Sequence, residues 1–371
     1  RGVMNLFNIL KTLVEQNSYT ANKAGVDKVG LKITNLMKDI GFNVEVHQRE
    51  LIGNHLHFIS PKKTGTKVLL LGHIDTVFPP DTFTQYSEDD EWVYGPGVCD
   101  MKGGLVVAMK ALYNQYEQNK DIYNIDFLMV SDEESGSDDS RALTAKIAQD
   151  YDICLVFEAA GEHNEVVVGR KGIGTYTIEI EGKAAHAGNF YAQGVDANLE
   201  LARKLEKLVA LTNLDIGSTV NVGKITGGIG ANTISPKASM LLELRYTKSS
   251  EKERILDAMQ TIVNTSYIEG TKSILRGNIQ RDVMEPNEQQ MAFIKQLENI
   301  SNTQIATEKR GGVSDANITA SMGLTTIDGF GPFGDGDHTK DERALKNTFV
   351  ERVALISKYF KIHQKEIKGV S

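Results

Sequence analysis

Acidic residues and histidines gather where the predicted strands of the chain end. His73 and Asp75 close the apolar run "LLLGHIDTV", Glu133 and Glu134 follow "IDFLMV", and Glu158 follows "DICLVF". The carboxyl ends of strands in an open α/β sheet line the ligand crevice. Polar side chains at three such ends therefore predict a ligand-binding or catalytic site at this edge of the sheet.

Two further candidates lie in glycine-rich segments. Asp100 belongs to "YGPGVCDMKGG", where the glycines let the backbone bend around one carboxylate before the next helix. His338 belongs to "GFGPFGDGDHTKDE". In that segment we expect Asp335 and Asp337 to be solvated loop residues.

This set of residue types favours a metal centre. Adjacent acids at a buried strand end raise one another's pKa and destabilise the fold unless a cation neutralises them. Two imidazoles with several carboxylates suit zinc, with cobalt or manganese as substitutes. The five candidate ligands are too many for one tetrahedral zinc, and they suit two ions about 3.5–4 Å apart if one carboxylate bridges. These candidates are His73, Asp100, Glu134, Glu158 and His338.

The remaining acid of the pair at 133 and 134 is then free to act as a general base. Adjacent residues of a strand face opposite ways, so the residue types alone leave the roles of Glu133 and Glu134 interchangeable.

The elements that must position these residues indicate an α/β fold, with a mixed sheet covered by helices. Short apolar runs at 68–71, 125–130 and 153–157 alternate with helical patterns. From about residue 172 the order becomes β-α-β-β-α-β, a compact unit able to close its own core. We expect a domain formed by 1–171 and 284–371, with 172–283 inserted into it.

Composition and charge exclude several classes of protein. A chain of 371 residues is long enough for two cores, and its net charge of −8 argues against a nucleic-acid partner. No apolar run approaches the length that crosses a bilayer, and the two cysteines fit a reducing compartment. The first residues read as an amphipathic helix rather than a signal peptide. We therefore expect a cytoplasmic protein with no membrane partner, and a periplasmic or secreted one if a leader has been removed.

Six short motifs follow one another along the chain: "GHIDTV", "GPGVCDMKGG", "SDEESGS", "FEAA", "GKAAHAG" and "DGDHTKDE". In this order they resemble the di-zinc metallopeptidase family of aminoacylases, succinyl-diaminopimelate and acetylornithine deacylases, and bacterial glutamate carboxypeptidases. The last subgroup is the most similar. The resemblance implies a zinc exopeptidase-like catalytic domain carrying an inserted ferredoxin-like α+β domain that serves as lid and dimerisation domain.

The resemblance also assigns roles to the candidate ligands. It implies that His73 and Glu158 complete one metal site, that Glu134 and His338 complete the other, and that Asp100 bridges the two. It further implies a cis peptide bond after the bridging aspartate.

Two more acids receive roles in the same way. Asp75 would accept the ring N–H of His73 and so fix the tautomer that binds metal. Glu133 would take a proton from the attacking water and deliver it to the leaving amine.

Four residues of the inserted domain match substrate-handling positions of the family. His186 in "GKAAHAG" corresponds to a histidine that reaches the partner subunit's active site and stabilises the oxyanion, so that catalysis requires a homodimer. Asn232 and Arg245 have the spacing of a substrate-binding pair. Arg281 matches an arginine that binds the substrate's terminal carboxylate, although Asp282 follows it where relatives have proline.

The favoured function is therefore hydrolysis of the amide bond before a C-terminal, glutamate-like residue of a small peptide. The alternative is an N-acyl-amino-acid deacylase, such as an acetylornithine deacetylase or aminoacylase. A non-catalytic scaffold that keeps the fold is the alternative from another class. An aminopeptidase is disfavoured because the candidate anchors are cationic.

A second pair of histidines has a spacing that could chelate metal. His55 and His57 in "NHLHF" share one strand face, but the sequence shows no acidic partners beside them. We expect a surface strand there.

Overall fold

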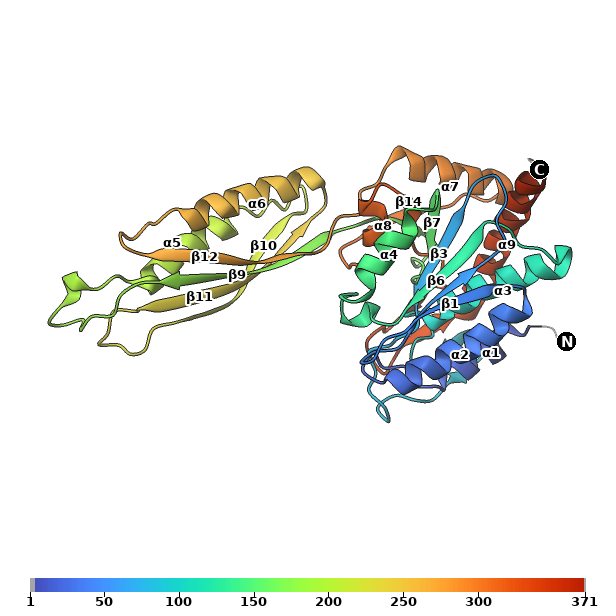
Figure 1. The fold of residues 1–371 in the computed structure, drawn as a ribbon, viewed down its shortest axis with the longest axis horizontal. Coiled ribbons are helices and arrows are strands. Elements are labelled where there is room, and N and C mark those ends of the chain that lie inside the picture. The colour runs from blue at the N-terminus through green and yellow to red at the C-terminus, as the bar shows by residue number, and fades with distance from the viewer. Residues whose placement is uncertain (1–3, 370–371) are drawn as a thin grey trace. The chain divides into compact units, whose positions relative to one another are not determined.

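The computed structural model describes residues 4–369 and divides them into two compact units (Figure 1). The larger unit contains residues 4–168, 286–310 and 314–369, and the smaller unit contains 169–285 and 311–313. The smaller unit thus begins and ends within a few residues of the expected insertion, 172–283, and adds a short separate segment. That segment joins it because Arg245 and Arg170 donate hydrogen bonds to the carbonyl groups of Gly311 and Gly312.

A six-stranded mixed sheet forms the centre of the larger unit, in the order β1-β2-β6-β3-β7-β14. β1, β2 and β6 pair antiparallel, whereas β6, β3, β7 and β14 pair parallel. The strands are β1 (Asn43–His47), β2 (His55–Ile59), β3 (Val68–His73), β6 (Ile125–Val130), β7 (Ile153–Val156) and β14 (Thr325–Ile327). The predicted α/β class is confirmed.

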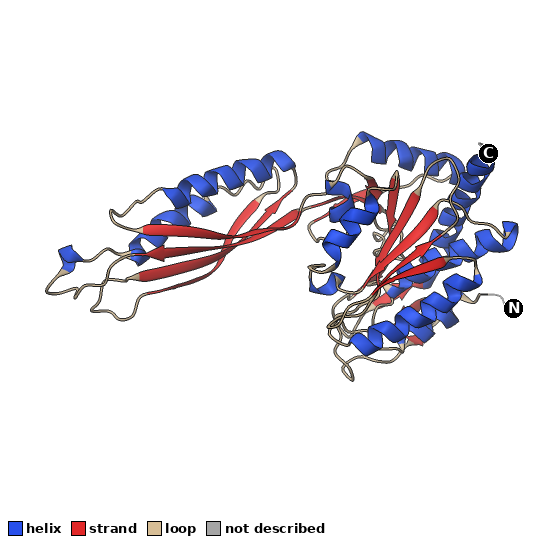
Figure 2. Ribbon diagram, in the orientation of Figure 1, coloured by secondary structure: helices blue, strands red, loops and turns tan. Residues whose placement is uncertain are grey.

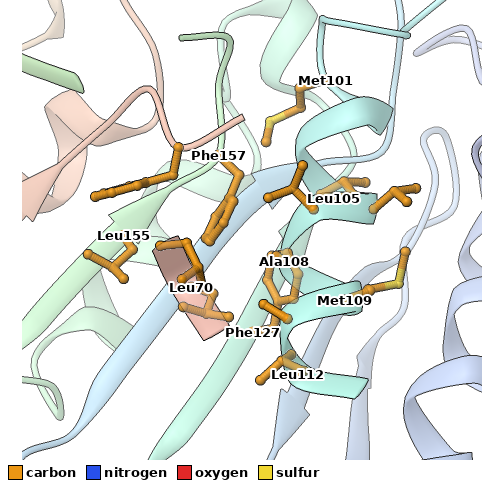
Figure 3. Packing of buried hydrophobic residues seen from close by; sticks show 14 of the residues in the cluster. Leu70, Met101, Leu105, Ala108, Met109, Leu112, Phe127, Leu155 and Phe157 are labelled. Atoms are coloured by element: carbon orange, nitrogen blue, oxygen red, sulfur yellow. The ribbon is translucent and has the colours of Figure 1, made fainter. Parts of the chain in front are cut away.

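Helices cover both faces of this sheet (Figure 2), which explains why every residue of β3 and β6 is buried. Figure 3 shows the core on one face, where Leu70 and Phe127 of the sheet pack near Leu105 and Ala108 of α3. The helices are α1 (Leu6–Val14), α2 (Lys23–Asp39), α3 (Lys102–Asn119), α4 (Ser140–Ala148), α7 (Glu288–Ser301), α8 (Ala316–Ser321) and α9 (Lys346–Gly369). The amphipathic helix expected near the N-terminus is α1.

Short strands and one turn of 3₁₀ helix complete the larger unit. A small sheet has the order β15-β16-β5-β4, and β13 pairs with β8. Their bounds are β4 (Ser87–Glu88), β5 (Trp92–Tyr94), η1 (Glu133–Ser135), β8 (Val166–Arg170), β13 (Thr307–Arg310), β15 (Gly334–Asp335) and β16 (Arg343–Leu345).

The smaller unit has the predicted β-α-β-β-α-β order. Its sheet runs β10-β11-β9-β12, the ferredoxin-like arrangement, and α5 and α6 cover one face (Figure 1). Along β11 the buried Leu242 and Leu244 face these helices, whereas Glu243 and Arg245 lie on the open face. The elements are β9 (Gly172–Glu181), η2 (Tyr191–Gln193), α5 (Ala197–Val209), β10 (Thr219–Gly227), β11 (Lys237–Tyr246), α6 (Ser249–Asn264) and β12 (Lys272–Arg281).

Within residues 4–369, no helix combines the length and the apolar character that a bilayer span requires.

Candidate metal centre

Three neighbouring parallel strands bring the predicted ligands together. β6, β3 and β7 are adjacent, so their carboxyl ends meet at one edge of the sheet. His73 is the last residue of β3, Glu158 lies two residues beyond β7, and Glu133 and Glu134 form η1 after β6. The strand order alone therefore gathers two of the predicted ligands, His73 and Glu158, beside the Glu133–Glu134 pair.

Asp100 lies between two imidazoles. Its Oδ1 is 3.2 Å from Nε2 of His73, and its Oδ2 is 3.1 Å from Nε2 of His338. Nε2 of His338 is also 3.1 Å from Oε2 of Glu134, and Nε2 of His73 is 3.5 Å from Oε1 of Glu158. The five predicted ligands thus form one continuous cluster with Asp100 at its middle.

Three overlapping groups in this cluster have ligand atoms within 4.8 Å of one another: His73 with Asp100 and Glu134, His73 with Glu133 and Glu158, and Asp100 with Asp337 and His338. Asp337 was expected to be only a solvated neighbour. It is exposed, but it belongs to the third group, and its membership is an addition that the sequence did not indicate.

The fully buried Asp75 orients both His73 and the turn that carries the two glutamates. Nδ1 of His73 lies 3.0 Å from the carbonyl oxygen of Asp75 and 3.3 Å from its Oδ1. The Asp75 carboxylate also accepts hydrogen bonds from the backbone N–H groups of Glu133 (3.3 Å) and Glu134 (3.2 Å), and from the Thr20 hydroxyl (2.7 Å). Nδ1 therefore carries the ring proton, which leaves the Nε2 lone pair of His73 directed at the cluster.

A second buried acid shapes the loop that presents Asp100. The Glu342 carboxylate accepts hydrogen bonds from the backbone N–H groups of Gly97, Cys99 and Asp100, at 3.0, 3.1 and 3.0 Å. The peptide bond between Asp100 and Met101 is cis, as expected. Sequence reasoning missed both Glu342 and Thr20 as supporting residues. Glu342 ends the quoted motif "DGDHTKDE", but nothing in the spacing of Thr20 marks it.

The electrostatics of the cluster show a strong demand for positive charge. Burial lowers the pKa of His73, but the carboxylates around it, Glu158 first, raise this pKa by more, to well above its usual 6.5. Hydrogen bonds to Asp100 and Glu134 raise the pKa of His338 to about 11. Burial raises the pKa values of Glu134 and Glu158 above their usual range. The carboxylates that raise the pKa values of the two histidines create a region of negative potential, which also favours divalent cations.

The residues present fit a pair of transition-metal ions. They offer two imidazole nitrogens and several carboxylate oxygens, the donor set of zinc and similar ions. Oε1 of Glu134 is buried and has no hydrogen-bond partner among the described residues, as expected for an oxygen reserved for a metal. Asp100 offers each of its oxygens to a different histidine, the arrangement that a bridging ligand requires.

Comparison with known proteins agrees with this chemistry. The sequence profile of peptidase family M20/M25/M40 matches residues 69–361, most of the chain. The chain belongs to this family. It is a hydrolase, a metallopeptidase or amidohydrolase with the two-metal centre typical of the family.

Individual relatives differ in activity. Carboxypeptidase G2 of Pseudomonas sp. is 25% identical over 346 residues, covering 89% of this chain and 82% of the relative. Succinyl-diaminopimelate desuccinylase of Coxiella burnetii is 24% identical over 358 residues, covering 90% and 93%. The crystal structure of aminopeptidase PepT from Bacillus cereus superposes with a TM-score of 0.82 at 22% identity, covering 98% of this chain and all of the other. At that identity the likeness supports the fold alone.

In this M20 family member, the four predicted substrate-handling residues lie in the smaller unit as two separate pairs. Arg245 and Arg281 both lie opposite Ile173 at the start of β9, where Arg245 is half-buried and Arg281 is buried. His186 and Asn232 lie beyond the other end of β9, where the carbonyl of Asn232 accepts a hydrogen bond from Ala187. β9 has ten residues and is therefore about 30 Å long, so one ligand cannot contact both pairs of the same chain.

His186 is exposed and has a defined tautomer. Its Nδ1 accepts hydrogen bonds from the backbone N–H groups of Gly188 and Asn189, both at 3.2 Å. The neutral ring therefore carries its proton on Nε2, which is the state needed to donate a hydrogen bond to an oxyanion.

The prediction for His55 and His57 was wrong. Both residues are buried rather than on the surface, and both have acidic neighbours. Nε2 of His55 lies 2.8 Å from Asp139, and His57 lies near Glu45 and Asp126. The reason is that Asp139 and Tyr151, distant in sequence, pack over the strand face that alternation alone could not show to be covered.

Proposed function

We propose that the chain is a zinc-dependent exopeptidase that hydrolyses the amide bond before a C-terminal, glutamate-like residue. The observation that carries the proposal is the cluster in which Asp100 joins His73 to His338, with Glu133, Glu134 and Glu158 around them. An arrangement with two imidazoles and a central carboxylate is suited to amide hydrolysis by a pair of metal ions.

The residues divide into two sets. His73 and Glu158 would hold one ion, Glu134 and His338 the other, and Asp100 both. Bound ions would polarise the scissile carbonyl and lower the pKa of a water molecule towards neutrality. Cobalt or manganese could replace zinc at the same ligands.

Glu133 is the proposed general base. It belongs to the group with His73 and Glu158, and its Oε2 lies 3.9 Å from Nε2 of His73. Its backbone N–H is held by Asp75, which fixes the turn on which the side chain is mounted. Glu133 would accept a proton from water as the water oxygen attacks the carbonyl carbon. It would then pass that proton to the amine nitrogen as the C–N bond breaks.

Arg245 and Arg281 support a substrate with a free terminal carboxylate. They share one row of the sheet: Arg245 is half-buried and donates hydrogen bonds to Glu243 and to the carbonyl of Gly311, and Arg281 is buried, with 3% of its surface exposed. Guanidinium groups bind carboxylates as planar forks. Arg281 is followed by Asp282, which accepts hydrogen bonds from Tyr246 (2.9 Å) and Lys252 (2.5 Å) and so has a structural use of its own.

The separation of the two pairs supports a homodimer. Because His186 and Asn232 cannot contact a ligand held by the arginines of the same chain, we assign them to the partner's substrate. The smaller unit offers a surface for pairing: the edge strand β10 with Ile225 exposed by 55%, beside Leu199 and Val209 of α5, exposed by 40% and 43%. An unpaired edge with apolar neighbours is a common site of association.

A substrate panel on zinc-loaded enzyme tests the proposed activity. A short peptide ending in glutamate should be hydrolysed much faster than its C-terminally amidated form, which lacks the carboxylate, and blocking its N-terminus should have little effect. Faster turnover of N-acetyl amino acids would favour the deacylase alternative. If blocking the N-terminus abolished hydrolysis while the C-terminally amidated peptide was still cleaved normally, an aminopeptidase would be favoured and the proposal contradicted.

Mixing two inactive variants tests the shared site. Glu133→Gln and His186→Ala should each be inactive alone, whereas mixed dimers contain one site with both native residues. After subunit exchange we expect about a quarter of wild-type activity. No recovery in mixed dimers, once their formation has been verified, would contradict a role for His186 in the partner's site.

A further inference from the structure

We propose that Glu45, His47 and His57 form a further metal site, separate from the centre, for a borderline divalent ion such as zinc. One carboxylate oxygen of Glu45 and one ring nitrogen of each histidine lie within 4.8 Å of one another. Two histidines and one glutamate form a common three-residue zinc ligand set, with water completing the coordination.

The pairing of β1 with β2 creates the cluster. Glu45 and His57 are directly opposite each other in the antiparallel ladder, and His47 follows Glu45 by two residues, so all three side chains project from the same face. β1 is the edge strand of the sheet, and β2 and β6 lie between it and β3, whose end carries His73. The site is therefore distinct from the proposed catalytic centre.

Hydrogen bonds select the metal-binding tautomer of His57. The Tyr151 hydroxyl donates its proton to the buried carboxylate of Asp126. The Tyr151 oxygen lies 3.1 Å from Nε2 of His57 and can therefore only accept, so this nitrogen carries the ring proton. Nδ1 then presents a lone pair towards Oε2 of Glu45, 3.8 Å away.

Two acceptors facing each other at that distance can hold a cation between them. The ligand atoms of a tetrahedral zinc are about 3.4 Å apart, given bonds of 2.0–2.1 Å, so a small side-chain movement closes the site. The chain Asp126–Tyr151–His57 also supplies the outer hydrogen bonds that orient metal-binding histidines.

His47 completes the set. Its Nε2 is buried and has no hydrogen-bond partner among residues 4–369. Burial lowers the pKa values of His47 and His57, so both rings are neutral near pH 7 and no proton competes for their lone pairs. His55, directly opposite His47, is unsuited because Ser131 N–H and Asp139 already occupy its two nitrogens.

Two nearby cations, those of Arg49 and Lys62, are paired with other acids. The Arg49 guanidinium pairs with Asp139, and the Lys62 ammonium pairs with Asp126. Both positive groups are thus neutralised by acids other than Glu45, which is largely exposed and available to a metal.

The test is the zinc content of the intact enzyme after equilibrium dialysis at micromolar free zinc. Wild type should hold one equivalent per chain more than Glu45→Gln or His47→Gln, whatever the occupancy of the catalytic centre. The matched control, His163→Gln, changes an exposed histidine outside both clusters and should match wild type. The exposed Glu45 makes Glu45→Gln the variant least able to disturb folding.

The result is a difference in zinc content between proteins, so it does not depend on peptidase activity. Tyr151→Phe retains all three ligands but loses the outer hydrogen bond, so it should weaken zinc binding at this site by about 10–100-fold. Zinc should also slow amide hydrogen exchange in β1 and β2 of wild type but not of His47→Gln. Equal zinc contents in wild type, Glu45→Gln and His47→Gln would overturn the proposal.

Discussion

Each unit buries charged side chains, but one buried ion pair of the smaller unit contrasts with the acid–histidine cluster of the larger unit. In the smaller unit, Lys204 and Glu200 are completely buried and lie 2.9 Å apart. Lys204 also donates to the carbonyl groups of Ile262 and Val263, and Glu200 accepts from the backbone of Ile268. Both charges of this pair are thus neutralised by each other and hydrogen-bonded to backbone groups.

The cluster at the ends of β6, β3 and β7 does not neutralise its own charges in this way. Its carboxylates outnumber its imidazoles, Oε1 of Glu134 has no partner among the described residues, burial raises the pKa of Glu158, and the neighbouring carboxylates raise the pKa of His338. A buried charge that the fold neutralises is structural, whereas one left to an external ion indicates function. The predictions below test this distinction, beginning with the largest expected effect.

Glu133→Gln should lower kcat by about 10²–10⁴-fold, because the amide cannot accept the proton of water. The variant should keep its metal content and melting temperature, since Gln preserves the shape of the side chain. Steady-state kinetics with metal analysis checks both. Glu162→Gln, at an exposed position, is the matched control and should leave the rate unchanged. An active Glu133→Gln enzyme would remove the proposed base.

Lys204→Met should destabilise the smaller unit by about 3–5 kcal/mol, because it leaves Glu200 charged and buried without its partner. Amide hydrogen exchange of α5 and β11 in the intact chain measures this free energy. Adding Glu200→Gln should recover part of the loss, since no lone charge then remains. Arg203→Met on the exposed side of the same helix serves as control. Unchanged protection in Lys204→Met would show that the pair is not structural.

Thr20→Val should weaken metal binding at the centre by about 10–100-fold, the usual range for a group that orients a ligand. The Thr20 hydroxyl holds Asp75, which in turn orients His73 and the Glu133–Glu134 turn. Competition with a chelator measures the affinity. Thr12→Val, which removes only a bond within a helix, should have no effect. Equal affinities in all three proteins would mean that Asp75 needs no such support.

Replacing a histidine that is buried in its neutral form should have the smallest effect, a change in the pH dependence of stability. His363 accepts a hydrogen bond from Gln364 at Nδ1 and donates to Thr66 O, and burial lowers its pKa. Below about pH 6.5 the unfolded chain therefore binds protons that the folded chain does not, so stability falls as pH decreases. The substitution His363→Gln should reduce the slope of the free energy of unfolding against pH by less than about 1.4 kcal/mol per pH unit. Thermal unfolding from pH 7 to pH 5 tests it, and an unchanged slope would contradict the neutral assignment.

The ligand set of the centre could be predicted because each member follows a recognisable strand or glycine-rich segment. Parallel strands bring their carboxyl ends together whatever their detailed register, so His73 and Glu158 need only the fold class to become neighbours. The order of elements in the inserted unit is equally visible, since its alternating strands and amphipathic helices give distinct patterns.

Supporting residues could not be predicted, because their roles depend on contacts between distant parts of the chain. Glu342 binds backbone groups more than 240 residues earlier, and Thr20 reaches Asp75 across 55 residues. The burial of His57 likewise depends on Tyr151, 94 residues later. Strand periodicity identifies the two faces of β2 but not which elements will cover them.

Metal content and activity of the same preparation test the central claim most directly. At nanomolar free zinc we expect about two equivalents per chain, loss of peptide hydrolysis on chelation, and recovery of both when zinc is restored. Chain that binds no divalent metal under these conditions, yet hydrolyses the peptide, would contradict a two-metal centre at His73, Asp100 and His338.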